Sequence, residues 1–244
     1  MYGLIGKKLG HSFSADFFNK KFADENIDER YELLPIPSIK DLPLLLKNNP
    51  GLKGLNVTIP YKQEVIPFLT ELSEEAKEIG AVNVIKIVNK GDLRELIGYN
   101  SDSIGFEQSL KPLLRADISQ ALILGTGGAS KAVEYVLKKL GIKYKFVSRQ
   151  LREGFLTYDQ LDRSVISKNR LIVNTTPLGM FPDTDTCPPL PYQFINNSHL
   201  CYDLVYNPAE TEFLKRCKNQ GAEIKNGLEM LERQALAAWE IWTH

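Results

Sequence analysis

The chain has 244 residues, 43% of them hydrophobic and 25% charged, and its 30 Lys and Arg residues balance its 30 Asp and Glu residues. This composition is typical of a globular protein, and the balanced charge gives no reason to expect nucleic acid or an anionic membrane as a partner. No apolar run approaches the roughly 20 residues of a membrane-spanning helix, and the N-terminal segment lacks a secretion-signal pattern. The three cysteines, Cys187, Cys201 and Cys217, are spaced too widely for a metal site or a disulfide framework. We therefore expect a cytoplasmic protein without a bound metal.

Apolar strand-like runs alternate with helical patterns along the whole chain. The predicted strands are residues 2–5, 31–34, 54–59, 83–87, 94–99, 120–124, 144–147, 170–173, 200–205 and 222–224. Alternating strands and helices indicate an α/β architecture with mainly parallel sheets.

Several helices between these strands have clear faces or ends. Apolar residues recur at helical spacing across Ala132–Leu140, and Gly141 follows as a stop. Asn207 followed by Pro208 is typical of an N-cap and a first helical residue, so the next helix is predicted to begin there. A helical pattern over residues 102–114 joins the two halves of the chain, and we place a domain boundary within it, near Gly105.

A glycine-rich turn opens the second half of the chain. The sequence ALILGTGGASKAV, residues 121–133, runs from a predicted strand through Gly125, Gly127 and Gly128 into a helix. Glycines permit a tight turn and close approach of the backbone to a diphosphate, and the helix that follows offers unpaired N–H groups. Ser130 stands where the usual motif has its third glycine, but a small residue there still allows the helix to pack on the strand. The turn predicts a dinucleotide-binding site, and a purely structural turn is the alternative.

The next predicted strand indicates which dinucleotide is bound. It ends in Ser148 and Arg149, about twenty residues beyond the glycines, where NAD-binding folds usually carry an acidic residue for the ribose hydroxyls. The planar guanidinium of arginine suits a 2′-phosphate instead. This residue favours NADP, unless Arg149 is simply an exposed loop residue.

Polar side chains also follow a strand in the first half, in the stretch LKGLNVTIPYKQEV, residues 52–65. Asn56 and Thr58 alternate along the predicted strand, Pro60 ends it, and Lys62 follows. Two interpretations are open: Asn56 and Thr58 face solvent beside a surface lysine, or the strand carries polar groups into a pocket.

Four further segments contain polar residues that amphipathic patterns do not explain. Ser12 and Ser14 precede a helix, and Ser14 also suits its N-cap. Asn83 enters an apolar strand, where a turn-forming asparagine is the alternative, and Asp102 lies between a strand and a helix, where a cap is the alternative. Gln234 shares an apolar helical face, so its amide needs a polar partner.

Together these segments resemble the shikimate dehydrogenase family. The resemblance covers nearly the whole chain in the family's order. Its motifs are HSFS (11–14), GLNVTIPYK (54–62), GAVN (80–83), YNSDSIGF (99–106), GTGGAS (125–130), NTTPLGM (174–180), DLVYNP (203–208) and GLEMLERQA (227–235). The most distinctive are N-V-T-x-P-x-K and the N-S-D triplet.

The resemblance implies a two-domain α/β fold. An N-terminal α/β substrate domain would comprise residues 1–104 plus 227–244, with the C-terminal helix returning to it, and a Rossmann-like doubly wound nucleotide domain would comprise residues 105–226. It also implies NADP-dependent, reversible reduction of 3-dehydroshikimate to shikimate, a step of aromatic amino-acid biosynthesis. The expected partners are this small-molecule substrate and NADP(H), and the expected assembly is a monomer or a homodimer.

The same resemblance implies roles for individual residues. Lys62 and Asp102 would form the catalytic pair, and which of them carries the transferred proton stays open. The implied substrate-binding residues are Ser12, Ser14, Thr58, Asn83, Ser101, Tyr206 and Gln234. The implied cofactor-binding residues are Gly125, Thr126, Gly127, Gly128, Ala129, Ser148, Arg149, Thr175 and Gly227.

The chain departs from the family pattern near both sites. Ser101 stands where threonine is usual, and Ser148 and Gln150 flank the arginine where asparagine and threonine are usual. Two alternative functions follow: a quinate/shikimate dehydrogenase with relaxed cofactor use, or a non-catalytic dinucleotide-sensing paralogue. The presence of both Lys62 and Asp102 argues against the sensor, which needs neither.

Overall fold

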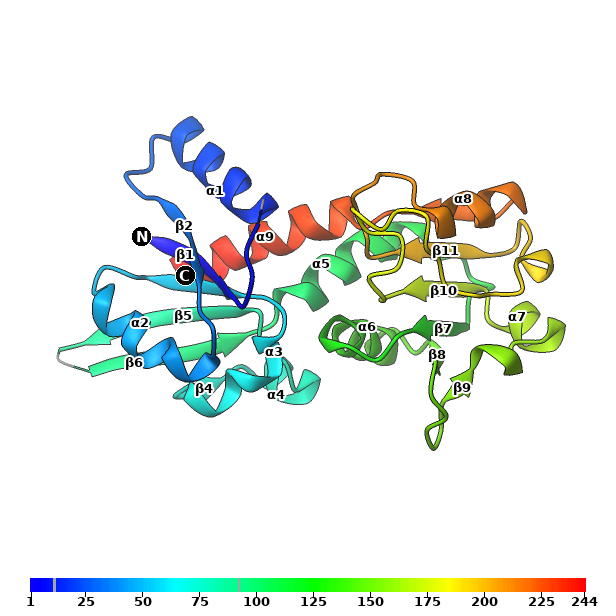
Figure 1. Cartoon of the computed structure of the whole chain (residues 1–244), viewed down its shortest axis with the longest axis horizontal. Coiled ribbons are helices and arrows are strands. Elements are labelled where there is room, and N and C mark those ends of the chain that lie inside the picture. The colour runs from blue at the N-terminus through cyan, green and yellow to red at the C-terminus, as the bar shows by residue number, and fades with distance from the viewer. Residues whose placement is uncertain (11, 92) are drawn as a thin grey trace. The chain divides into compact units, whose positions relative to one another are not determined.

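The computed structural model describes residues 1–10, 12–91 and 93–244. His11, the first residue of the HSFS motif, lies outside these ranges. The chain divides into two compact units, a first unit of residues 1–104 with 234–244 and a second unit of residues 105–233 (Figure 1). Within the described ranges, no helix is both long enough and apolar enough to cross a membrane.

The first unit is built on a mixed sheet. Its strands lie in the order β2 (Tyr31–Pro35), β1 (Tyr2–Gly6), β3 (Gly54–Val57), β5 (Val84–Lys90), β6 (Leu93–Tyr99) and β4 (Glu71–Leu72). Strand β1 is parallel to both β2 and β3, and β4 is parallel to β6, whereas β5 is antiparallel to its neighbours β3 and β6. The expectation of mainly parallel pairing therefore holds for this sheet except at β5, which runs antiparallel to both of its neighbours.

Helices cover both faces of this sheet. They are α1 (Phe13–Asp24), α2 (Leu42–Asn48), α3 (Tyr61–Glu64) and α4 (Glu74–Ile79), with 3₁₀ turns at Ile39–Asp41 and Ile66–Phe68. Leu4 and Ile5 belong to different core clusters because successive strand residues point to opposite faces. The cluster with Ile5 includes residues of α2, and the cluster with Leu4 includes Phe18 of α1.

The C-terminal helix α9 (Leu228–Thr243) packs its last turns on the sheet of the first unit. Trp242 donates its indole N–H to the carbonyl oxygen of Ile85 at 3.0 Å. A Cβ atom on Gly54 would lie 2.3 Å from Trp242 Nε1, so only glycine lets the ring come this close to β3. The start of the same helix belongs to the second unit, because Met230 is part of that unit's core. The compact units therefore divide at residue 233, whereas the predicted domain boundary placed residues 227–233 with the first domain.

The second unit contains a fully parallel sheet. Its strands lie in the order β12 (Glu223–Lys225), β11 (Leu200–Asp203), β10 (Leu171–Asn174), β7 (Gln120–Leu124), β8 (Lys143–Ser148) and β9 (Leu156–Thr157). Helices α6 (Gly128–Lys139), α7 (Arg163–Lys168) and α8 (Glu212–Asn219) accompany it, with 3₁₀ turns at Tyr158–Gln160 and Tyr192–Phe194. Helix α5 (Ser101–Leu110), followed by a 3₁₀ turn at Lys111–Leu113, connects the two units. Neighbouring residues of strand β7 again belong to different core clusters, one on each face of the sheet. Ile123 packs with α6, and Leu122 packs with α8.

Helix α8 begins later than the sequence predicts. Its N-cap is Thr211, whose hydroxyl oxygen accepts the amide hydrogen of Leu214 at 3.3 Å, and its first residue is Glu212. Asn207 and Pro208 lie in the loop before it. The side chain of Thr211, and not that of Asn207, reaches an N–H group of the first turn. Phe213, Leu214 and Cys217 of this helix face the core.

Candidate active site

Strand β3 and the short helix α3 place Lys62 at the carboxyl-end edge of the first sheet. The strand ends at Val57, two residues earlier than predicted, and Pro60 occupies the N-cap of α3. The backbone N–H of Val82 donates to the carbonyl oxygen of Lys62 at 2.7 Å, which ties α3 to the Gly80–Asn83 loop. The Lys62 side chain is only 18% exposed, so the interpretation of Lys62 as an ordinary surface lysine is wrong.

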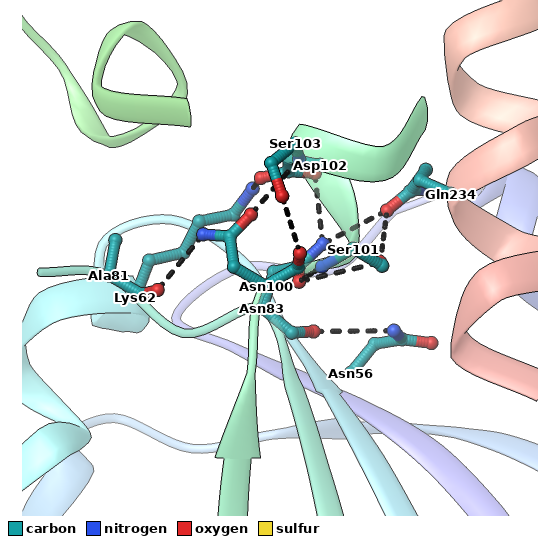
Figure 2. Close-up of polar contacts among 9 residues, drawn as sticks. All are labelled: Asn56, Lys62, Ala81, Asn83, Asn100, Ser101, Asp102, Ser103 and Gln234. Atoms are coloured by element: carbon teal, nitrogen blue, oxygen red, sulfur yellow. Dashed lines mark hydrogen bonds and ion pairs between the residues drawn. The ribbon is translucent and has the colours of Figure 1, made fainter. Parts of the chain in front are cut away.

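Helix α5 presents Asp102 in its first turn without using it as a cap. The capping acceptor is Asn100, whose Oδ1 receives the amide hydrogen of Ser103 at 3.2 Å. The carboxylate of Asp102 is therefore free to pair, and its Oδ2 accepts a hydrogen bond from Lys62 Nζ at 2.6 Å (Figure 2). With 8% of the Asp102 side chain exposed, this ion pair is largely shielded from water and from screening by salt.

Asn83 lies at the centre of the cluster. Its Nδ2 is 2.9 Å from Asp102 Oδ1, 3.0 Å from Ser101 Oγ and 3.1 Å from Gln234 Oε1. Its Oδ1 accepts the backbone N–H of Ser101 at 2.7 Å. Asn83 is thus a fully engaged side chain, not a turn former, and it holds the start of α5 through both ends of its amide (Figure 2).

Gln234 joins the cluster from helix α9. Its Oε1 faces Asn83 Nδ2 and the hydroxyl of Ser101, the latter at 3.5 Å. The residue lies at the point where α9 enters the first unit, next to the buried Ala235. The polar partner predicted for an amide on an apolar helical face is therefore Asn83. The Nε2 hydrogens of Gln234 bond to no described residue, which leaves them for a ligand.

Ser12, Ser14 and Thr58 lie in the same unit, outside this hydrogen-bonded cluster. Ser12, not Ser14, occupies the N-cap of α1, and its hydroxyl makes no capping bond. Ser14 hydrogen-bonds to the hydroxyl of Tyr31, an interaction that opposes the raised pKa which burial gives this tyrosine. Thr58 follows β3 and donates its backbone N–H to the carbonyl oxygen of Ile5 at 2.9 Å.

Asn56 is the polar residue of this strand that sequence reasoning left unassigned. It is buried, its Oδ1 accepts the Tyr31 hydroxyl hydrogen at 2.7 Å, and its Nδ2 donates to the carbonyl oxygen of Asn83 at 3.3 Å. The solvent-facing interpretation of Asn56 is therefore wrong. An amide at a position that alternates with apolar residues was the available signal.

The glycine turn between β7 and α6 has the shape that a dinucleotide needs. Gly125 has φ 103°, and a Cβ atom there would lie 2.9 Å from Thr175 Oγ1, so only glycine fits without strain. Gly127 is the N-cap of α6, and a Cβ atom on it would meet nothing within 4 Å. Thr126 completes the turn, and Gly128 and Ala129 begin the helix, whose first N–H groups suit an anion.

A second polar turn follows β10, beside the first. Thr175 donates both its N–H and its hydroxyl to the carbonyl oxygen of Leu124, at 2.9 and 2.6 Å. The buried Asn174 accepts the N–H and hydroxyl of Thr176 and donates to Asp203 Oδ1 at 3.0 Å. Asp203 is fully buried, which raises its pKa to about 6 against the opposing hydrogen bonds.

The remaining predicted cofactor residues lie at two places in the second unit. Ser148 ends β8 and accepts the N–H of Gln150, and the exposed Arg149 forms no ion pair with any described residue. Gly227 donates to the carbonyl oxygen of Val205, and a Cβ atom on it would lie 2.1 Å from the carbonyl oxygen of Leu204. Backbone packing therefore requires glycine at 227 whether or not it contacts a cofactor. Tyr206 follows β11 in the same unit.

Comparisons with known proteins identify the family of this chain. The family model for the shikimate dehydrogenase substrate-binding domain matches residues 4–85. The shikimate dehydrogenase (NADP(+)) of Clostridium beijerinckii is 41% identical, over 99% of this chain and 91% of that protein. The chain belongs to the shikimate dehydrogenase family.

Solved structures of the family have the same fold. Shikimate 5-dehydrogenase from Thermus thermophilus, in complex with NADP(H) and shikimate, has a TM-score of 0.86 and is 29% identical, with 99% of this chain and 92% of that chain covered. Quinate dehydrogenase from Corynebacterium glutamicum, in complex with NAD, has a TM-score of 0.87 at 29% identity, with 99% and 93% covered. The family resemblance and the predicted fold class, a substrate domain followed by a Rossmann-like domain, are confirmed.

Proposed function

We propose that this protein reduces 3-dehydroshikimate to shikimate with NADPH, and runs the reaction in reverse with NADP⁺. The observation that carries the proposal is the largely buried Lys62–Asp102 ion pair, held by Asn83 in a cluster that also contains Ser101 and Gln234. The first unit would bind the substrate and the second the cofactor. The named activities of the relatives support this proposal.

The first unit supplies the proton handling that reduction of a ketone requires. The hydride gained by the carbonyl carbon is supplied by NADPH when it is bound. The carbonyl electron pair then moves to oxygen, which takes a proton from the Lys62–Asp102 pair, and solvent returns that proton afterwards. Lys62 is suited to this place because an ammonium has three N–H donors and Asp102 uses one, which leaves two for the oxygen that gains charge.

The polar side chains around the pair would orient the substrate. Shikimate carries hydroxyl groups and a carboxylate, and these need both donors and acceptors from the protein. Gln234 Nε2 offers donors beside the pair, and Asp102 Oδ1 and Ser101 Oγ offer acceptors. We assign the hydroxyls of Ser12, Ser14 and Thr58, and the side chain of Tyr206, to the remaining substrate groups.

The second unit fits NADP(H) on two grounds. The open space at Gly127 and the N-terminus of α6 suit a diphosphate, because N–H groups and the helix dipole favour negative charge. Arg149 would bind the 2′-phosphate, since its guanidinium is exposed at the end of β8 and forms no ion pair within the described ranges. Thr126, Gly128, Ala129, Ser148, Thr175 and Gly227 would complete the site.

Quinate with relaxed cofactor use is the second candidate. The structural likeness to a quinate dehydrogenase in complex with NAD favours it, together with the unusual Ser148 and Gln150 on either side of Arg149. Quinate and shikimate share the hydroxyl to be oxidised, so the Lys62–Asp102 pair serves both substrates equally. The two functions differ only in the residues that would contact the rest of the substrate ring and in those that would contact the 2′-phosphate of the cofactor.

We further propose a cytoplasmic location and a monomeric or homodimeric assembly. Cys201 and Cys217 are buried free thiols, and a hydrogen bond with Cys201, together with burial, raises the pKa of the Cys217 thiol. Thiols of this kind are inert and fit a reducing compartment.

The test is a spectrophotometric assay of purified protein with shikimate or quinate and NADP⁺ or NAD⁺. We expect reduced cofactor to form fastest with shikimate and NADP⁺. Equal rates with quinate and NAD⁺ would favour the second candidate. Tight NADP⁺ binding without turnover of either acid would favour the non-catalytic paralogue and contradict the proposed function.

A further inference from the structure

Asn100 has a position that its capping role does not explain. It lies just before α5 and is 2% exposed, and both atoms of its amide are engaged. Its Oδ1 caps the helix by accepting the N–H of Ser103. Its Nδ2 reaches away from the helix and donates to the carbonyl oxygen of Ala81 at 2.9 Å. Capping needs only the oxygen, so the second bond serves another purpose.

That second bond leads to Lys62 through a single peptide group. Ala81 and Val82 are joined by one peptide bond, whose carbonyl oxygen accepts from Asn100 and whose N–H donates to the carbonyl oxygen of Lys62 at 2.7 Å. One rigid, planar group therefore connects the backbone that carries Lys62 with the backbone that begins α5. Figure 2 shows Asn100 between Ala81 on one side and the first turn with Asp102 on the other.

The loop of residues 80–83 makes a second hydrogen bond to the start of α5. Asn83, two residues beyond Ala81, accepts the backbone N–H of Ser101 at 2.7 Å. An asparagine of the loop thus holds the helix, and an asparagine at the helix start holds the loop. Together these bonds fix the first turn of α5 in position and in rotation about its axis, and the rotation decides where the Asp102 carboxylate points.

We propose that Asn100 is a positioning residue for proton transfer, which sets the Asp102 carboxylate against Lys62 by clamping the start of α5 to the Ala81–Val82 peptide. This inference rests on the proposed function, because it assumes that Lys62 and Asp102 handle the proton. Both polar atoms of the Asn100 side chain are bonded to backbone groups, so we assign Asn100 no contact with the substrate or the reacting atoms. It acts through the geometry of Asp102 alone.

The two roles of Asn100 are separable by substitution. Serine is as good an N-cap as asparagine and adds no charge, but it is too short to reach the carbonyl oxygen of Ala81. Asn100→Ser therefore keeps the cap and removes the clamp. A misplacement of about 1 Å at a reacting group can cost about 10²-fold in rate. We expect kcat with shikimate and NADP⁺ to fall about 10- to 100-fold while the KM for NADP⁺ stays within about twofold.

A double-mutant cycle distinguishes positioning from general stabilisation. If Asn100 acts through Asp102, then adding Asn100→Ser to an Asp102→Asn protein should change kcat by less than about twofold, because the group being positioned has already lost its function. A merely structural role predicts the same loss of kcat in both backgrounds. Full additivity would overturn the proposal.

Ser73→Ala is the matched control. Ser73 caps α4 in the same unit by accepting the N–H of Ala76 at 3.1 Å, and its loss removes a cap without touching the clamp. We expect a lower melting temperature and an unchanged kcat. If Asn100→Ser and Ser73→Ala lower kcat alike, helix stability explains the effect and the inference is wrong.

The remaining outcomes separate the inference from the proposed function. A parent protein that turns over shikimate, with Asn100→Ser folded and within twofold of it in kcat, overturns the inference alone. A parent without any turnover overturns the proposed function and the inference with it. If circular dichroism shows Asn100→Ser to be unfolded, Asn100→Thr, which also caps and fills more of the space, takes its place. Unfolding of both variants would mean that the amide serves the fold, against the proposal.

Discussion

The candidate site of the first unit consists of side chains, whereas that of the second unit consists mainly of backbone. In the first unit, the side chains of Lys62, Asp102, Asn83 and Gln234 bind one another, so each one fixes its neighbours before any ligand arrives. In the second unit, the site at Gly125–Gly128 consists of backbone, open space and a helix end. Proton transfer demands side chains held to a fraction of an ångström, whereas a long anionic cofactor demands a smooth surface with N–H donors. The comparison predicts that changes in the first unit affect turnover and changes in the second affect cofactor affinity.

The largest expected effect comes from removing the amine of the first site. Lys62→Ala should lower kcat about 10²–10⁴-fold, with a smaller change in KM, because the ammonium interacts most strongly with the oxygen that gains charge in the transition state. Steady-state kinetics with shikimate and NADP⁺ measures this. Circular dichroism must show the variant to be folded. A kcat within a few-fold of the parent would mean that this lysine has no catalytic role.

Arg149→Ala should give the next largest effect, this time in affinity. A hydrogen bond to a charged group is worth about 1.5–3 kcal/mol, so the KM for NADPH should rise about 10- to 100-fold. The KM for NADH serves as the internal control and should stay nearly unchanged, because NADH lacks the 2′-phosphate. Equal changes for both cofactors would show that Arg149 does not bind the 2′-phosphate.

A pair of glycine variants sharpens the description of the second site. Gly127→Ala should leave the melting temperature unchanged, since its Cβ atom meets nothing within 4 Å, but should raise the KM for NADPH roughly tenfold by occupying the space meant for the diphosphate. Gly125→Ala should lower the melting temperature, because φ 103° strains any other residue and Thr175 lies too close. A stable Gly127→Ala protein with the parent's KM would place the cofactor elsewhere.

Most of the architecture could be predicted from local patterns. Alternation and helical spacing located ten of the strands, and they failed for β4 (Glu71–Leu72) and β9 (Leu156–Thr157), because two residues are too short to show a period. The start of α8 was misplaced because Asn207 and Thr211 both suit a cap, and only the tertiary structure selects one. The antiparallel pairing of β5 was missed because alternation says nothing of strand direction.

The sequence predicted which residue types belong to the candidate site, but not which of them hydrogen-bond to one another. Gln234 was singled out because an amide on an apolar helical face needs a partner, yet that partner, Asn83, is 151 positions away in the chain. Asn56 and Asn100 were missed as members because each donates its amide hydrogen to a distant backbone carbonyl, of Asn83 and of Ala81, and sequence patterns do not show which distant residues meet. The buried carboxylate of Asp203 was missed because only the three-dimensional structure shows its burial and that no described residue pairs with it as a cation.

The smallest change in activity is expected from Asp203, which should instead affect stability. Its pKa is raised by burial from 3.8 to about 6 in the folded protein, so between these pH values the folded chain holds a proton that the unfolded chain has lost. Raising the pH through this window should therefore weaken folding, by up to about 3 kcal/mol. Urea unfolding of the parent and of Asp203→Asn at pH 4.5 and pH 7 measures the difference. If the free energy of unfolding changes equally between these pH values in the parent and in Asp203→Asn, the pKa of Asp203 is not raised in the folded protein.

The most direct test of the account is a double-mutant cycle on the ion pair itself. We predict that Asp102→Asn slows turnover of shikimate with NADP⁺, and that the Lys62→Ala, Asp102→Asn double variant is within about tenfold of the slower single variant, because the two residues act as one unit. Four kcat values, measured on folded proteins, decide the matter. If the losses of the two single variants multiply in the double variant, Lys62 and Asp102 act independently, and the claim that their buried ion pair handles the proton is wrong.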